Sequence, residues 1–300
     1  MQVGTRAGPP AGILSVDVED YFQVEAFADR VDRNRWQEYP SRVERNTRII
    51  LDLLDENGVK GTFFTLGWIA EHFPGVVREI GARGHEIACH SYWHRVVYRL
   101  SPEEFREDTV RAKQAIEDAA GVAVVGYRAP NFSVTRKSLW ALEILAECGF
   151  RYDSSIFPIR HDVYGFPEAP RAPFRVDTPA GPLAEFPMTT FRCWGSPNLP
   201  IGGGGYLRIF PEFVTRFGVR KAFEDGLPLV TYLHPWEVDP EQPRLAGRLT
   251  SRLRHYTNLQ KTAQRLRNLM GRVRFSSFRD SGWIDTALRA EPESLLRTPA

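Results

Sequence analysis

The feature that most constrains the fold of this chain is a repeated alternation of short β-rich runs with helical stretches over its first two-thirds. Apolar residues recur at helical spacing at 42–57 and 74–83, and each stretch ends at a glycine. Ser101-Pro-Glu-Glu begins a further helix with a capping box, and that helix ends at Gly121. Runs with the composition of buried strands stand at 13–18, 61–66, 85–89, 122–127 and 152–156. These strand–helix units predict a parallel sheet with right-handed crossovers, either doubly wound or closed as a barrel.

Residues 157–210 interrupt this alternation. The segment is rich in proline, glycine and aromatic residues and is too long for a simple connection, so we expect an elaborated loop region over the active face. The pattern resumes with a helix at 212–224 and a strand at 229–233. Because no linker separates two parts, we expect a single domain with a core at about 12–236, the insertion, and a C-terminal extension at 237–300.

Composition excludes several classes of protein. The 300 residues include 42% hydrophobic and 25% charged residues, the balance of an ordinary globular protein. A net charge of +2 gives no strong attraction to nucleic acid, so no nucleic-acid partner is expected. Basic residues are dense from Arg244 to Arg274, where the simplest interpretation is the solvated face of a helix at 251–269. The three cysteines form no CxxC pair, which favours reduced thiols over a cysteine zinc site.

The sequence also carries expectations about location. It has no run of about 18 apolar residues, so no transmembrane segment is expected. Residues 1–12 lack the apolar region of a secretory signal, so the expected location is the cytoplasm, near the inner face of the membrane.

Polar clusters follow four of the predicted strands. In parallel α/β folds, ligands and catalytic groups gather at the carboxyl ends of the strands, so this placement predicts a site. In chain order the clusters are Asp17-Val18-Glu19-Asp20, His90-Ser-Tyr-Trp-His94, Tyr127-Arg128-Ala129-Pro130 and Leu233-His234-Pro235-Trp236. Each has a structural explanation when taken alone, such as a helix cap, a packed histidine or a surface arginine before a proline turn.

The residue types of the first two clusters suit a metal ion. Three carboxylates at one strand end repel one another unless a cation or an arginine lies among them. Two histidines four residues apart on a helical turn present their rings to the same side, which is a spacing that metal sites use. The motif is not HExxH, because Ser91 stands where that motif has its glutamate base.

The other two clusters supply the remaining parts of a hydrolytic site. An arginine that points into a cleft can fix the direction of a carboxylate base. A histidine at the mouth of the sheet can act as a general acid near neutral pH. Metal ligands, base, orienting arginine and acid on successive strand ends are the parts that metal-assisted hydrolysis of an amide requires.

In their order and context, the four clusters resemble those of the NodB-type polysaccharide deacetylases, carbohydrate esterase family 4. The resemblance covers roughly residues 13–236 and includes the HxxxH, Arg-Ala-Pro and Leu-His motifs, although two residues separate Asp17 from Asp20 where the family has adjacent aspartates. A narrower resemblance is to a branch encoded beside exosortase and exopolysaccharide genes. It rests on the strings SVDVEDYFQV, SSIFPIRHDVYGFPEAPR, LPIGGGGYLR, YLHPWEVDPEQPR and RHYTNL.

The resemblance implies a distorted (β/α) barrel of the polysaccharide deacetylase type, with a long insertion and a C-terminal extension. It also implies metal-dependent hydrolysis of N-acetyl groups on an amino-sugar polysaccharide, an exopolysaccharide or its precursor. The cofactor would be one divalent ion, Zn²⁺ first, with Co²⁺ or Ni²⁺ able to use the same ligands.

The family's roles carry over to residues of this chain. Asp17 would be the base, Arg128 would orient it, and His234 would be the acid, with Asp153 tuning His234. Three further residues would lie on the substrate and oxyanion side: Asn131 through its backbone N–H, Pro130 and Trp236. The metal ligands would be His90, His94 and a carboxylate of Glu19 or Asp20.

Two other functions remain open at this point. One is an amidohydrolase acting on a small cyclic amide or ureide, and the other is a catalytically inactive carbohydrate-binding protein. The joint presence of base, arginine and acid argues against a pure binder.

Gly202–Gly205 would let the backbone approach the substrate groove. The aromatic residues of the insertion would stack on sugar rings: Phe157, Tyr164, Phe166, Phe174, Phe191, Trp194 and Tyr206.

Overall fold

The structure is a computed structural model that describes residues 12–161, 164–193 and 195–295. Its centre is a nine-stranded sheet with the order β10-β1-β2-β3-β4-β5-β7-β6, to which β11 belongs by pairing with β1. All pairings in this sheet are parallel except that of β6 with β7. The strands are β1 Gly12–Val18, β2 Thr62–Thr65, β3 Glu86–Cys89, β4 Gly126–Tyr127, β5 Tyr152–Asp153, β6 Phe174–Thr178, β7 Gly181–Glu185, β8 Thr190–Phe191, β9 Leu199–Pro200, β10 Leu229–Leu233 and β11 Phe275–Ser276.

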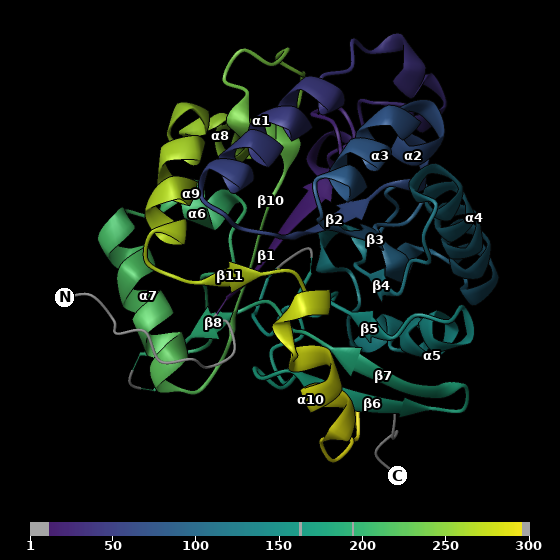
Figure 1. Cartoon of the computed structure of the whole chain (residues 1–300), viewed down its shortest axis with the longest axis vertical. Coiled ribbons are helices and arrows are strands. Elements are labelled where there is room, and N and C mark those ends of the chain that lie inside the picture. Colours follow the sequence, from purple (N-terminus) through teal and green to yellow (C-terminus); the bar gives the residue numbers. More distant parts are fainter. Residues whose placement is uncertain (1–11, 162–163, 194, 296–300) are drawn as a thin grey trace.

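Helices surround this sheet, as Figure 1 shows. They are α1 Val43–Glu56, α2 Gly67–His72, α3 Pro74–Ala82, α4 Pro102–Ala120, α5 Trp140–Glu147, α6 Gly205–Ile209, α7 Glu212–Glu224, α8 Leu249–Tyr256, α9 Thr262–Met270 and α10 Trp283–Arg289. None of the helices in the described ranges is long and apolar enough to cross a membrane. The mostly parallel sheet with flanking helices confirms the predicted fold class.

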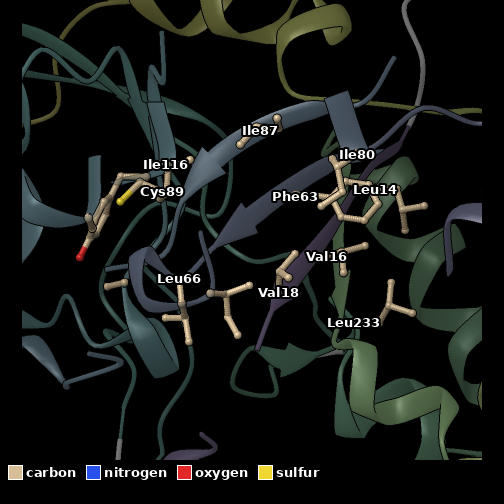
Figure 2. Close-up of a cluster of buried hydrophobic side chains, with 14 of the residues drawn as sticks. Leu14, Val16, Val18, Phe63, Leu66, Ile80, Ile87, Cys89, Ile116 and Leu233 are labelled. Carbon is tan, nitrogen blue, oxygen red and sulfur yellow. The ribbon is translucent and has the colours of Figure 1, made fainter. Parts of the chain in front are cut away.

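Alternation along β1 separates two buried layers. Leu14, Val16 and Val18 belong to the large core between sheet and helices, which Figure 2 shows together with Phe63 and Leu233. Successive side chains of a strand point to opposite faces, so Ile13, Ser15 and Asp17 point the other way. Ile13 accordingly lies in a second buried cluster. Asp17 therefore points to the face of the sheet opposite the large core. It is the first polar group of the predicted site.

The insertion differs from its prediction as a loop region over the active face. Strands β6 and β7 form a hairpin that joins the main sheet, with β7 parallel to β5. Its aromatic residues are mostly packed inside the protein rather than free to stack on sugars. Phe157, Phe166, Phe174 and Phe191 are buried, Tyr164 and Tyr206 are half-buried, and Trp194 lies outside the described residues.

The glycine run 202–205 also has a structural use. Gly204 N donates to Tyr232 O on β10, and a Cβ at Gly203 would lie 2.2 Å from that same oxygen. Gly203 has φ of 109°, a backbone conformation that residues other than glycine rarely adopt. The glycines therefore let the backbone approach β10, where we had expected them to face substrate.

Several predicted elements are shorter or divided. The strand expected at 122–127 consists of Gly126–Tyr127, and that expected at 152–156 consists of Tyr152–Asp153. The basic helix expected at 251–269 is two helices, α8 and α9, because Asn258 between them has left-handed φ of 58°. The C-terminal extension contributes β11 to the sheet, so it is part of the fold.

Candidate metal centre and active site

Glu19, His90 and His94 form a cluster that can hold a metal ion. One ligand atom from each lies within 4.8 Å of the others, and all three residues are buried. Glu19 Oε2 is 2.8 Å from His94 Nε2, and the two histidine rings are 5.3 Å apart between centroids. Residues from two strand ends, β1 and β3, therefore converge as predicted for the carboxyl edge of a parallel sheet.

The backbone that presents the histidines is a loop and not the helical turn we expected from their spacing. Ser91 and His94 have left-handed φ of 65° and 50°. Asp108 of α4 fixes this loop, because its carboxylate accepts hydrogen bonds from Tyr92 N at 2.7 Å and Trp93 N at 3.2 Å. The rings converge because tertiary contacts hold the loop. Asp108 is a supporting residue that the sequence did not identify.

The chemistry of this cluster fits a divalent ion such as zinc. His90 Nδ1 bonds the carbonyl oxygen of Arg128 at 2.8 Å, which leaves Nε2 available as a ligand. Glu19 Oε2 lies 2.8 Å from His94 Nε2 but makes no hydrogen bond of good geometry, and His94 Nδ1 is buried without a hydrogen-bond partner among the described residues. A buried polar atom without a partner costs stability unless a water molecule or an ion satisfies it. One carboxylate with two imidazoles is a common ligand set of catalytic zinc.

Protonation in the cluster also suits metal binding. Burial lowers the pKa of His90 to about 4, so the ring is neutral at pH 7, as a ligand must be. Burial by itself would raise the pKa of Glu19, but the neighbouring His94 and His234 outweigh it and hold that pKa below the usual range. Glu19 is therefore a carboxylate at neutral pH.

Asp20, the alternative carboxylate, lies in a different environment. Its Oδ2 accepts hydrogen bonds from Ser41 Oγ at 2.7 Å, Arg42 N at 2.8 Å and Val43 N at 3.1 Å. Its Oδ1 accepts from Tyr21 N at 2.9 Å. The bonds from Arg42 N and Val43 N satisfy two of the free N–H groups at the start of α1. Asp20 is thus engaged as a helix cap, and the cluster contains Glu19 instead.

Asp17 and Arg128 form a buried ion pair beside the cluster. Arg128 Nη1 donates to Asp17 Oδ1 at 2.7 Å and to Ser15 Oγ at 2.7 Å. Its Nε and Nη2 donate to the backbone oxygen and Oγ of Ser154. The guanidinium also lies 4.1 Å from the ring centroid of Phe64. These contacts hold Arg128 in one orientation, and Arg128 in turn fixes Asp17.

His234 approaches the cluster from β10. Its Nε2 is 3.3 Å from Glu19 Oε1, and its Nδ1 is 2.7 Å from Glu237 Oε1. Burial lowers the pKa of His234, but the carboxylates of Glu19 and Glu237 raise it on balance. With 16% of its side chain exposed, it is the most open of these groups, where the metal-cluster residues have 3% or less.

The partner of His234 is Glu237, whereas we expected Asp153. Asp153 Oδ1 instead accepts from Ser155 Oγ at 2.5 Å, and the Asp153 carboxyl group shares a hydrogen bond with that of Glu185. Glu237 is held by the buried Arg208 of α6. The spacing His-x-x-Glu could have suggested Glu237, but Arg208 lies 29 residues before Glu237 and has no local signal.

The three residues expected on the substrate side are placed differently from one another. Trp236 is buried, and its indole Nε1 donates to Glu19 Oε1 at 3.2 Å, so it supports a candidate ligand. Pro130 is buried at the start of a 3₁₀ turn. Asn131 is half-buried and has left-handed φ of 55° in the loop after Arg128.

Comparison with known families divides the chain in two. Residues 36–152 match the polysaccharide deacetylase family model, and residues 154–282 match a domain of unknown function, DUF3473. The first match includes His90, His94 and Arg128, and the second includes Arg208, His234 and Glu237. The candidate site therefore draws residues from both regions, while Asp17 and Glu19 lie before the first match.

Curated relatives match part of the chain. It is 36% identical over 95 residues to the peptidoglycan-N-acetylglucosamine deacetylase of Bacillus cereus, covering 31% of this chain and 34% of that protein. It is 32% identical over 98 residues to the chitooligosaccharide deacetylase of a Bradyrhizobium strain, covering 32% of this chain and 42% of that protein. The chain thus spans less than half the length of each of these relatives.

Among solved structures, a protein from Mycobacterium smegmatis described as a candidate polysaccharide deacetylase has the same fold. The two share 21% identity with a TM-score of 0.61, over 100% of this chain and 99% of the other. The likeness to this structure shows a shared fold, and the polysaccharide deacetylase model and the curated relatives match only part of the chain.

Proposed function

We propose that this protein is a metal-dependent N-deacetylase of an amino-sugar polysaccharide. The observation that carries the proposal is the Asp17–Arg128 ion pair beside Glu19, His90 and His94, with His234 Nε2 3.3 Å from Glu19 Oε1. A carbohydrate-binding protein would need no oriented base and acid beside such a cluster. The long strings shared with the exopolysaccharide-associated branch favour an exopolysaccharide, or its precursor, as the polymer.

The residues of the chain divide the work of amide hydrolysis. Glu19, His90 and His94 would hold a divalent ion, zinc first, which supplies a Lewis acid and lowers the pKa of water in the site. Asp17 takes a proton from the attacking water while the oxygen of that water bonds to the acyl carbon. The buried Arg128 keeps Asp17 pointed at that water. The N–H of Asn131 stabilises negative charge on the acyl oxygen.

His234 completes the reaction. When the carbon–nitrogen bond breaks, the departing amine must take a proton, because an amine anion is too poor a leaving group. His234 donates that proton from Nε2, while Glu237 holds Nδ1 and so fixes the orientation of the ring. The products are acetate and a free amino sugar.

The test is acetate release from N-acetylhexosamine oligomers by the full chain, before and after chelation and after zinc is restored. We expect activity that chelation removes and zinc restores. Asp17→Asn should lower kcat by roughly 10²–10⁴-fold while metal content is unchanged. A cyclic ureide serves as the competing substrate. Hydrolysis of that compound alone, or acetate release that resists chelation, would overturn the proposal.

A further inference from the structure

Exposed apolar side chains are concentrated in one segment of the sequence. Among the described residues seven large hydrophobic side chains are exposed, and five of them fall between residues 209 and 253. These five are Ile209, Phe213, Phe217, Leu249 and Leu253, while the other two, Val110 and Val122, lie elsewhere in the chain. Single exposed hydrophobic residues are ordinary, but a gathering of them marks a contact surface.

Helix α8 carries two of these side chains. Leu249 is 69% exposed and Leu253 is 58% exposed, and their spacing of four puts them on the same helix face. Arg248, Arg252 and Arg254 are exposed beside them. Within the described ranges no ion pair joins these three arginines to an acidic group, so their charge is available to a partner.

Helix α6 extends the surface and ties it to the candidate site. A Cβ at Gly205 would lie 3.8 Å from Arg254 Cγ and 3.9 Å from Ile209 Cδ1, so Ile209 adjoins α8. Arg208, the next residue to Ile209, donates to the carbonyl oxygens of Arg254 and His255 and pairs with Glu237. We call Ile209, Leu249, Leu253, Arg248, Arg252 and Arg254 the α8 patch.

The charge of the surrounding segment is one-sided. Residues 242–279 contain ten lysines and arginines and no aspartate or glutamate. The rest of the chain has 29 basic and 37 acidic residues. The net charge of +2 therefore hides a strongly basic region that includes α8, although the molecule as a whole is nearly neutral.

We propose that the α8 patch binds the surface of an anionic phospholipid bilayer. Exposed leucines between arginines are the pattern of a helix that lies in the membrane interface, where apolar side chains enter the headgroup boundary and cations meet lipid phosphates. A soluble polyanion would gain nothing from the leucines. A second copy of the chain would bring two sets of unpaired arginines together. Binding here would place the candidate site beside saccharides carried on the membrane.

The test measures sedimentation of the full chain with vesicles of phosphatidylcholine mixed with phosphatidylglycerol, and with vesicles of phosphatidylcholine alone. Binding should need the anionic lipid and weaken with salt. Removing all three charges in Arg248→Gln/Arg252→Gln/Arg254→Gln should lower affinity by about 100-fold, roughly fivefold for each arginine. Leu249→Ser/Leu253→Ser should lower it by about tenfold or more.

Matched controls stand on other surfaces. Arg45→Gln/Arg78→Gln/Lys137→Gln removes three exposed charges, and Val110→Ser/Val122→Ser removes two exposed apolar groups. Both should bind vesicles like the unmodified protein, and all variants should keep their activity on soluble oligomers. Absence of vesicle binding overturns the proposal, as does equal loss in patch and control variants. It is also overturned by a dimer in lipid-free solution that the leucine substitutions dissociate.

Discussion

Two buried arginines, Arg128 and Arg208, show how differently the two halves of the candidate site are built. Arg128 follows β4 and reaches Asp17 and Ser15 of β1, so parallel strands of one sheet place both partners. Arg208 lies on α6 and pairs with Glu237, while it also donates to backbone oxygens at 254, 255 and 257. The sheet therefore sets the position of Arg128, whereas loops and α8 set the position of Arg208.

The comparison divides the chemistry between the halves. The amino-terminal half contributes Glu19, His90 and His94 as candidate ligands and Asp17 as candidate base. The carboxyl-terminal half contributes His234 as candidate acid, with its orientation set by the Glu237–Arg208 pair. Metal binding and proton delivery should therefore respond to different substitutions, which the following experiments examine.

The largest expected effect comes from one histidine of each half. His94→Ala removes a candidate ligand, so bound metal and acetate release should both fall to background. His234→Ala should keep the metal and lose roughly 10²–10⁴-fold in kcat, since it removes only the proton donor. Metal content by atomic spectroscopy and kcat on the same samples check both. A metal-free His234→Ala protein would erase the proposed division between the halves.

The second effect tests the buried pair of the carboxyl-terminal half. Arg208→Met leaves Glu237 buried without its cation, which should cost about 3–5 kcal/mol of unfolding free energy. Adding Glu237→Gln removes the unpaired charge, so the double variant should regain much of this stability. Urea denaturation measures both.

Arg216→Met, an exposed substitution on α7, is the control for that experiment and should change stability by no more than about 0.5 kcal/mol. If Arg208→Met were as stable as this control, Arg208 would not hold the second half together.

The amino-terminal half also carries a pH-dependent contribution to the unfolding free energy, at a residue outside the site. His85 is buried and its Nδ1 accepts from Gly61 N at 3.2 Å, and burial lowers its pKa to about 4. Because the pKa of this histidine in the unfolded chain is about 6.5, the contribution of neutral His85 to the unfolding free energy is complete above that pH. It is lost as the pH falls toward 4. The loss should reach about 3 kcal/mol at pH 4.

The variant for this pH effect is His85→Gln, which keeps an acceptor for Gly61 N but does not titrate. Its unfolding free energy should fall less between pH 7 and pH 4 than that of the unmodified protein. An identical pH profile for the two proteins would show that His85 is not held neutral in the fold.

The smallest effect concerns Asp20. Asp20→Asn weakens the cap of α1, which should cost about 1–2 kcal/mol of stability and leave bound metal unchanged. Glu19→Gln, its neighbour, should instead lose metal. A matched pair of thermal melts and metal analyses separates the two carboxylates, and loss of metal from Asp20→Asn would reverse their assigned roles.

The sequence by itself determined the elements whose signals are local. Apolar runs predicted β1, β2 and β3, and the capping box at Ser101 predicted the start of α4. Because parallel strands end at one edge, it also followed that clusters after successive strands would meet there. That reasoning is enough to bring Asp17 to Arg128 and a carboxylate of Glu19 or Asp20 to the histidines.

Only the tertiary structure decided between residues of equal chemistry. Glu19 and Asp20 are both carboxylates at the same strand end, and the choice depends on where the start of α1 lies. The pairing of Glu237 with Arg208 likewise depends on where α6 lies, whereas His234 and Glu237 are neighbours on one turn. A sequence records which groups a chain carries. Which of them is used by a helix end and which is left facing a metal cluster depends on contacts between distant segments, and no local pattern contains these.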